Sequence, residues 1–185
     1  MRRTLFLILV LAFLPFSARA HMLIPPCDFV TGGGFVFTDA DGLATFAIQG
    51  GCKNGDWWGG INYIDHQTGL HFRSRDVTGY MMDPADPNAR EICGNGVIND
   101  MTEVSFRVRV VDNGEPGRKD LFGIGLDNRH TSGDRFYYVT ARLLADGEKG
   151  GGDIQLHKTN PSTTAGAGFS DLQEWQMCGD LNSPQ

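Results

Sequence analysis

Most of the chain alternates between apolar and polar residues with the period of two that is typical of β-strands. In the clearest run, the apolar residues of 104–110 alternate with Ser105, Arg107 and Arg109, as expected for a strand with one buried face. Further strands are predicted at 34–38, 43–49, 60–65, 69–75, 77–82, 121–126, 136–144 and 153–158. The pattern predicts an all-β fold of roughly nine short strands, arranged as an antiparallel β-sandwich or a β-barrel.

Turn-forming residues separate these runs, and only the tail is predicted to be helical. Turn sequences that contain glycine, in two cases together with aspartate, occupy 39–42, 66–69, 112–117 and 150–152. Ser170 to Gln173 fit a capping box, and Gly179 lies just beyond the end of this short helix. We therefore expect a signal peptide at 1–20, an N-terminal arm at 21–31, a β domain at 32–158 and a linker with a disulfide-tethered helical tail at 159–185.

The first twenty residues have the features of a signal peptide. Arg2 and Arg3 precede an apolar run at 5–13, and small residues before His21 fit a cleavage site. The apolar run is too short to anchor the chain, and no later segment is apolar enough to span a bilayer. We expect a secreted protein, extracellular or periplasmic, whose mature chain begins at His21.

Four cysteines, Cys27, Cys52, Cys93 and Cys178, follow the predicted signal peptide. An even number in an exported chain predicts two disulfides, for which three connectivities exist. We prefer Cys27–Cys178, which joins the two ends of the domain, together with Cys52–Cys93. The spacing contains no paired C-x-x-C, so we do not expect a zinc site.

Charge limits the classes of partner. Three of the sixteen basic residues and none of the twenty-two acidic ones lie in the signal segment, so the mature chain carries a formal charge of −9. Nucleic acid is not expected as a partner, because binding phosphates requires clustered Lys and Arg. The balance is compatible with bound cations.

Two acidic turns are candidate calcium sites. Asp39 and Asp41 resemble the start of a calcium loop, and Asp112 and Glu115 lie in a second oxygen-rich turn that also contains Asp120. Both segments also read as ordinary turns, and neither offers enough ligands to complete a calcium site. Calcium at either turn is a hypothesis, and no cofactor is firmly implied.

The loop around two adjacent tryptophans is the candidate ligand site. Trp57 and Trp58 lie among glycines, with Asn54 and Asp56 beside them. Indole faces with neighbouring amide and carboxylate groups suit the apolar faces and hydroxyls of a sugar. The alternative is that the tryptophans fill an end of the β-structure.

The competing hypothesis is a small exported enzyme. An N-terminal histidine can chelate copper through its amine and ring, so His21 could form a copper site with a second histidine, for which His66, His71, His130 and His157 are available. A chance histidine after the cleavage site explains the same observation. No arrangement typical of a hydrolase is present: Asp65 and His66 are adjacent, so on a strand they would face opposite ways. The residues favour a binding or accessory module over an enzyme and leave the enzyme alternative open.

Four motifs occur in order along the chain: VTGGGFVF, INYIDHQTGLHFRSRDVTGY, VVDNGEPGRKDLFGIGL and GGGDIQLHK. Together they resemble the post-choice-of-anchor domains, small bacterial secreted domains found alone or after choice-of-anchor surface modules. The resemblance covers about 32–158. It implies an all-β, extracellular domain that is often appended to larger surface proteins, and it implies no catalytic residue. The chain departs from the family in the insert at 50–59, in Asp153 where the family has Asn, and in the Cys-bearing tail.

These observations favour a secreted, non-catalytic binding or accessory module at the cell surface or outside the cell. If the module binds a ligand, we expect a carbohydrate contact at Trp57 and Trp58, and a glycan or a cell-surface protein is the candidate partner. The alternatives are the copper-dependent oxidative enzyme and a purely structural domain that packs against partner proteins.

Overall fold

The structure, a computed structural model, describes residues 22, 27–128, 135–144, 151–163, 172–179 and 181–184. Within these ranges the chain forms nine β-strands and one five-residue helix. No helix among them is long and apolar enough to cross a membrane. The elements are β1 (Phe29–Phe37), β2 (Leu43–Lys53), β3 (Asp56–Asp65), β4 (Leu70–Asp83), β5 (Asp86–Ile98), β6 (Thr102–Val111), β7 (Leu121–Asn128), β8 (Arg135–Leu143), β9 (Gly152–His157) and α1 (Glu174–Cys178).

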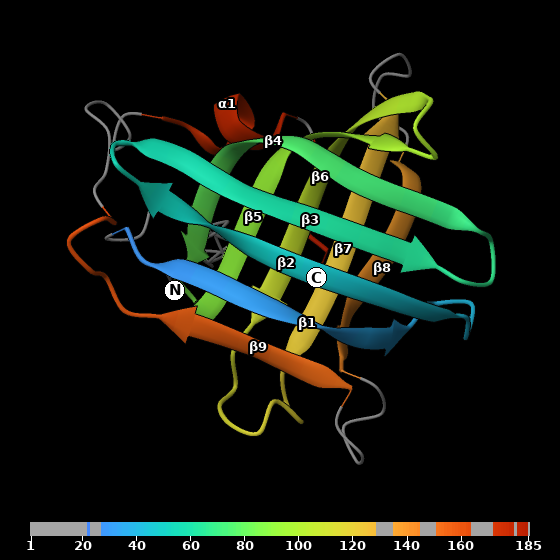
Figure 1. The fold of residues 1–185 in the computed structure, drawn as a ribbon, viewed down its shortest axis with the longest axis horizontal. Coiled ribbons are helices and arrows are strands. Elements are labelled where there is room, and N and C mark those ends of the chain that lie inside the picture. Colours follow the sequence, from blue (N-terminus) through green and yellow to red (C-terminus); the bar gives the residue numbers. More distant parts are fainter. Residues whose placement is uncertain are drawn as a thin grey trace, which may run out of the picture.

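All nine strands belong to one antiparallel sheet in the order β8-β7-β6-β5-β4-β3-β2-β1-β9. The sheet curls over itself, so that β9, β1, β2, β3 and the first part of β4 cross in front of β5 to β8 at a steep angle (Figure 1). We call these two parts the front layer and the back layer. The predicted all-β class is confirmed, and the architecture is a single curled sheet, a half-barrel.

The inner faces of the two layers form the main hydrophobic core. Phe46 of β2 stacks on Phe122 of β7 with ring centroids 4.0 Å apart, and Tyr63 of β3 lies 5.9 Å from the same ring. Tyr63 also shares a 2.6 Å hydrogen bond with Tyr137 of β8, whose hydroxyl donates to Asp65. Because both phenols are largely buried, their pKa values are raised, and they stay protonated as hydrogen-bond donors.

Strand β4 carries the chain from the front layer to the back layer. Residues 69–75 and 77–82 were predicted as two strands, but they form one strand with register shifts after Ser74 and Val77. Such bulges bend and twist a strand without ending it. The pairing of β4 with β5 continues on both sides of the bulges.

Strand β5 is absent from the sequence-based prediction. Its residues include Pro87, Asn88, Gly94 and Gly96, which favour turns when they are considered locally. In the sheet, Gly96 has a packing role, because a Cβ there would lie 2.5 Å from the Phe72 ring. The missed strand and the divided β4 cancel, which is why the predicted number of strands agrees with the structure.

The preferred disulfide pairing is wrong. The structure pairs Cys27 with Cys52 and Cys93 with Cys178, and it has no free cysteine. Cys52 follows the inward positions of β2, whereas Cys93 lies on the outward side of β5, so a bond between them would have to pass through the sheet. Cys27 lies directly before β1, whose Phe29 is paired with Gly51, and this register brings Cys27 beside Cys52.

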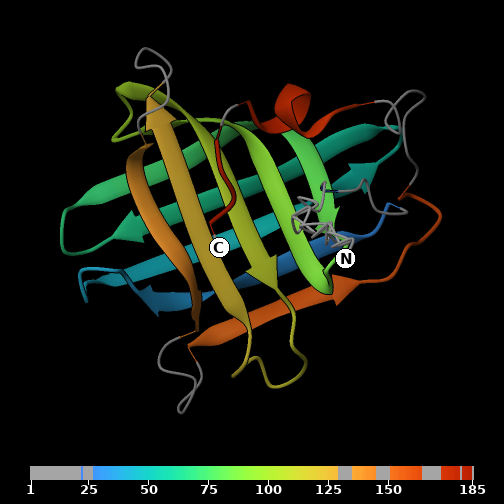
Figure 2. The ribbon, with the colours of Figure 1, turned by 180° about the vertical axis from the view of Figure 1, so that it is seen from behind.

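Residues 172–179 and 181–184 of the C-terminal segment lie over the outer face of the back layer (Figure 2). The described part of this segment crosses β5, β6 and β7 from outside (Figure 2). Glycines make room for it: a Cβ at Gly79 would lie 2.4 Å from Met177, and one at Gly123 would lie 2.9 Å from Pro184. Cys178 fixes α1 to β5, so the expectation that this cysteine ties the tail to the body is confirmed, with Cys93 as its partner.

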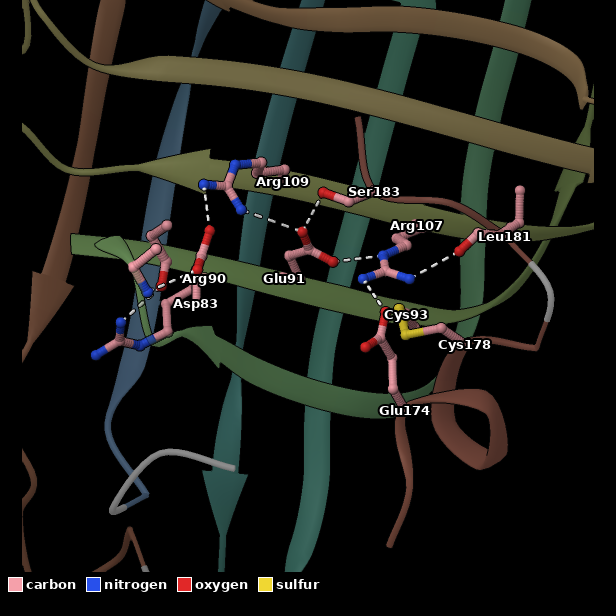
Figure 3. A network of polar contacts seen from close by, with 12 residues as sticks. Asp83, Arg90, Glu91, Cys93, Arg107, Arg109, Glu174, Cys178, Leu181 and Ser183 are labelled. Atoms are coloured by element: carbon pink, nitrogen blue, oxygen red, sulfur yellow. Dashed lines mark hydrogen bonds and ion pairs between the residues drawn. A yellow bond between two sulfur atoms is a disulfide. The ribbon is translucent and has the colours of Figure 1, made fainter. Parts of the chain in front are cut away.

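A buried ionic network lies beneath this segment. Glu91 of β5 is fully buried and accepts hydrogen bonds from both Arg107 and Arg109 of β6 (Figure 3). Arg109 also pairs with Asp83 at 2.8 Å. A charged group buried away from water needs several hydrogen-bond or ion-pair partners, and the guanidinium groups of Arg107 and Arg109 both have them.

The tail supplies the remaining partners of the network. Arg107 donates to the Leu181 carbonyl at 2.7 Å and pairs with Glu174 at 2.6 Å, while Ser183 hydrogen-bonds to Glu91. The tail therefore buries these charges and also completes their hydrogen bonding. Arg107 and Arg109, which alternation alone places on a solvated face, are buried for this reason.

Replacing both Cys93 and Cys178 by Ala is expected to lower the free energy of unfolding by about 2–5 kcal/mol. The bond closes a loop of 85 residues and holds the tail over the ionic network. The Cys27→Ala, Cys52→Ala pair, which opens a loop of only 25 residues, should cost roughly 1 kcal/mol less in the chain-entropy account. Urea unfolding monitored by tryptophan fluorescence measures both, and equal losses would contradict the assigned connectivity.

Candidate functional site

The outer face of the front layer is not covered by any other element of the described structure (Figure 1 and Figure 2). Along each strand, outward residues alternate with core residues, so β2 presents Thr45, Ala47 and Gln49 on this face while Phe46 and Ile48 point inward. The described part of the C-terminal segment lies on the opposite layer (Figure 2). The front layer therefore presents a sheet face built from five neighbouring strands.

Three aromatic side chains form a row across this face. Strand register places Trp58, Gly51, Phe29 and His157 side by side on β3, β2, β1 and β9. The Phe29 ring stacks on the His157 imidazole at 4.4 Å and lies 6.0 Å from the Trp58 ring. Gly51 is essential to this contact, because a Cβ there would lie 2.5 Å from that of Phe29. Trp58, Phe29 and His157 are each half-buried, and we call them the aromatic row.

A shallow depression of about 380 Å³ lies beside the aromatic row. We call it the front depression. Its position follows from the β3–β4 ladder, which stops at the pair Asn62–Arg73; beyond this point the two strands separate. Ser74 occupies the gap, and its hydroxyl accepts the Ile61 amide hydrogen at 2.8 Å. The residues that line the front depression include Ala47, Gln49, Gly60, Asn62, Arg73 and Ser74.

Polar groups around the front depression are held by neighbours on the same face. Asn62 accepts a hydrogen bond from His71 at 2.9 Å through its side-chain oxygen, and Arg73 pairs with Asp100. Thr31 bonds His157 at 2.8 Å, which orients the imidazole that stacks on Phe29. The Phe29 and His157 rings stack face to face, while the Trp58 ring is tilted by 49° to Phe29 and has the Lys53 ammonium 5.8 Å from its centroid. The arrangement places half-buried aromatic rings beside ammonium, amide and guanidinium donors, a combination that suits a ligand with apolar patches and many oxygen acceptors.

Of the four predicted ligand residues, Trp58 and Asp56 lie on the outward side of β3, and only Trp58 belongs to the aromatic row. Adjacent residues of a strand face opposite ways, so Trp58 points outward whereas Trp57 does not. Trp57 packs against the main core and against a smaller apolar cluster of Met81, Cys93, Met177 and Cys178. Asn54 occupies the β2–β3 turn with φ 52°, and its backbone N–H donates to the backbone carbonyl of Ser162. Asp56 accepts the amide hydrogen of Trp57 at 2.8 Å. The two tryptophans therefore do not form one platform.

The predicted calcium ligand Asp39 is bonded to another strand. Its carboxylate accepts hydrogen bonds from the Thr140 hydroxyl and from Arg142 of β8, both at 2.8 Å. Burial opposes ionisation of Asp39, but these bonds outweigh it and lower its pKa. Asp41 is exposed at the tip of the same turn, with φ 58°. This carboxylate ties the β1–β2 hairpin to β8.

The second acidic turn protects the edge of the sheet. Asp112 accepts the amide hydrogens of Gly114 and Leu156, and Asp120 accepts that of Ile154 at 2.8 Å. Leu156 and Ile154 belong to the edge strand β9, so the carboxylates occupy amide groups that another strand could otherwise pair with. Glu115 is exposed beside them.

No group of three His, Cys, Asp or Glu side chains in the described ranges is placed to hold a metal ion. The structure therefore gives calcium at Asp39, Asp41, Asp112 and Glu115 no support. The copper hypothesis stays a prediction, because His21 lies outside the described residues, as does His130. Of the other histidines, His66 bonds Thr45, and His71 and His157 have the partners given above.

A second, larger depression of about 490 Å³ lies at the end of the half-barrel next to His157. Its lining includes Asp28 and Asp112, whose carboxylates already have strong partners. Asp28 accepts from Tyr80 and pairs with Arg90, and Asp112 binds the two backbone amides described above. It presents no aromatic face besides His157, so the front surface is the better candidate.

Comparisons of the chain with models of protein families, with curated proteins and with solved structures found no match. The resemblance to the post-choice-of-anchor domains stays a prediction. A function for this chain is therefore inferred from the geometry of its own surface.

Glu115 provides a test of the acidic edge. The negative charge of Asp153 is the main cause that raises the pKa of Glu115 above its ordinary value, with smaller effects of burial and of Asp112. Replacing Asp153→Asn should lower that pKa, because ionised Glu115 would then face one fewer negative charge. An NMR titration of the Glu115 side chain measures the change, and an unchanged value would contradict the assigned coupling.

Proposed function

We propose that this protein is an exported, non-catalytic module that binds a glycan on the outer face of its front layer. The observation that carries the proposal is the aromatic row, in which Trp58, Phe29 and His157 from three strands lie side by side next to the front depression. Sugars present apolar faces that pack on aromatic rings and hydroxyls that bond to amides and guanidinium groups.

The dimensions of the surface favour an extended ligand. Strands lie about 4.8 Å apart, so a row across four strands spans roughly 14 Å, which exceeds the width of a single sugar ring. The front depression lies further along β2 and β3 from Gly51 and Trp58, so the surface continues past the aromatic row. This geometry suits binding along a polysaccharide better than capture of a free monosaccharide.

Export is part of the proposal. Two disulfides suit an oxidising compartment, where such bonds persist, and the first twenty residues predict a signal peptide. The motifs that resemble bacterial surface domains support the same location, either at the cell surface or outside the cell. A role as a purely structural domain predicts no glycan binding and is an outcome of the test below.

The Trp58→Ala variant should weaken glycan binding by roughly 30-fold, because a tryptophan at the centre of a binding surface contributes about 2 kcal/mol. Trp175→Ala is the matched control: this indole is 67% exposed, but it lies on α1 over the other layer. The binding of soluble polysaccharides is measured by affinity electrophoresis and calorimetry.

An equal loss in the two variants would contradict the assignment of the front layer. Absence of binding to any polysaccharide by the wild-type protein would contradict glycan binding itself and would favour the structural role. Circular dichroism of each variant shows that the sheet is intact, so that lost binding is not confused with unfolding.

A further inference from the structure

We propose that the glycan is acidic and that Arg73 recognises its carboxylate groups in the front depression. This inference rests on the proposed function and names the class of ligand. The eight residues that line the front depression include one arginine and no acidic residue. In a chain with twenty-two acidic and sixteen basic residues, such a surface is selective for negative charge.

The contact that holds Arg73 is readily exchanged. Its guanidinium pairs with Asp100, but the two side chains are 51% and 71% exposed. Water screens such a pair, so it contributes little to stability. Asp100 lies in the β5–β6 turn with φ 61° and does not line the front depression. A ligand carboxylate can therefore replace Asp100 without leaving a buried charge unpaired.

Arginine is suited to this task by its shape. The planar guanidinium presents two parallel N–H groups to both oxygens of a carboxylate, which adds geometric selectivity to charge attraction. Asn62 lies directly opposite Arg73 in the strand pair, and its side-chain oxygen already accepts a hydrogen bond from His71. Its amide nitrogen is thus the group left to donate to a ligand.

A second amide lies on the far side of the depression. The side-chain nitrogen of Gln49 lies 3.6 Å from the position that a Cβ of Gly60 would occupy. The Gln49 side-chain amide therefore lies above Gly60. Gln49 and Gly60 are two residues from Gly51 and Trp58 on the same strands, and they face the same way. A sugar chain that contacts Trp58 and continues along β3 would therefore reach Asn62 and Arg73.

The net charge of the protein makes the inference specific. At a formal charge of −6, the whole chain repels polyanions at long range, so general electrostatic attraction does not account for binding to an acidic polymer. Attraction must come from a local site. Arg75, the next outward arginine of β4, pairs with Glu103 and does not line the front depression.

The test compares acidic polysaccharides with their methyl esters, which keep the same sugar rings but lose the charge. Polygalacturonate, alginate and hyaluronate are each titrated calorimetrically in both forms. The wild-type protein should bind at least one acidic form about tenfold more tightly than its ester. Arg73→Gln should abolish this preference and leave binding of the ester unchanged.

Two further variants make the comparison sharper. Arg75→Gln is the matched control, and it should change the affinity for the acidic polymer by less than about twofold. Asp100→Asn removes the carboxylate that competes for Arg73 and should raise this affinity roughly threefold; asparagine also tolerates the positive φ of this turn.

The outcomes separate this inference from the proposed function. If the esters bind as tightly as the acids and Arg73→Gln has no effect, while Trp58→Ala still weakens both, the ligand is a neutral glycan and the inference is overturned. If Arg73→Gln and Arg75→Gln lower the affinity equally, the attraction is general and not a site at Arg73. If the protein binds neither form of any polymer, nor any neutral glycan, both the inference and the proposed function fail.

Discussion

The structure depends on the need of one long sheet to bury its apolar face. The described residues form nine strands in a single sheet and no layer of helices, so the inner surface is covered by the sheet itself. Strand β4 makes this possible, because its bulges after Ser74 and Val77 turn the chain from the front layer into the back layer. The contact of Phe46 with Phe122 then joins the layers.

Curling gives the sheet two outer faces with different roles. The back face carries Glu91, Arg107 and Arg109, which become buried when the tail covers them. Burying charges costs free energy unless every group is bonded, and the tail contributes a carbonyl, a carboxylate and a hydroxyl for this purpose. The Cys93–Cys178 bond keeps these partners in place. The back face thus serves the stability of the fold.

The two edges of the sheet are bonded to acidic side chains, whereas the front face is left open. Asp39 binds an amide and side chains of the edge strand β8, while Asp112 and Asp120 occupy outward amides of the edge strand β9. Edge pairing with other chains is thereby opposed. Carboxylates that look like metal ligands in the sequence therefore have a structural role. The front face, with its aromatic row and its depression, is the surface that we assign to binding.

The sequence alone determined the fold class, most of the strands and the existence of two disulfides, because alternation and the count of cysteines are local properties. It also drew attention to the loop with Trp58, which the structure places beside Phe29. Only the tertiary structure decided which cysteines pair, that β5 is a strand and that Arg107 and Arg109 are buried. Phe29 and His157 could not be linked to Trp58 in advance, since they lie far apart along the chain and meet through strand register. Register and curl arise from long-range pairing and core packing, which no local pattern specifies.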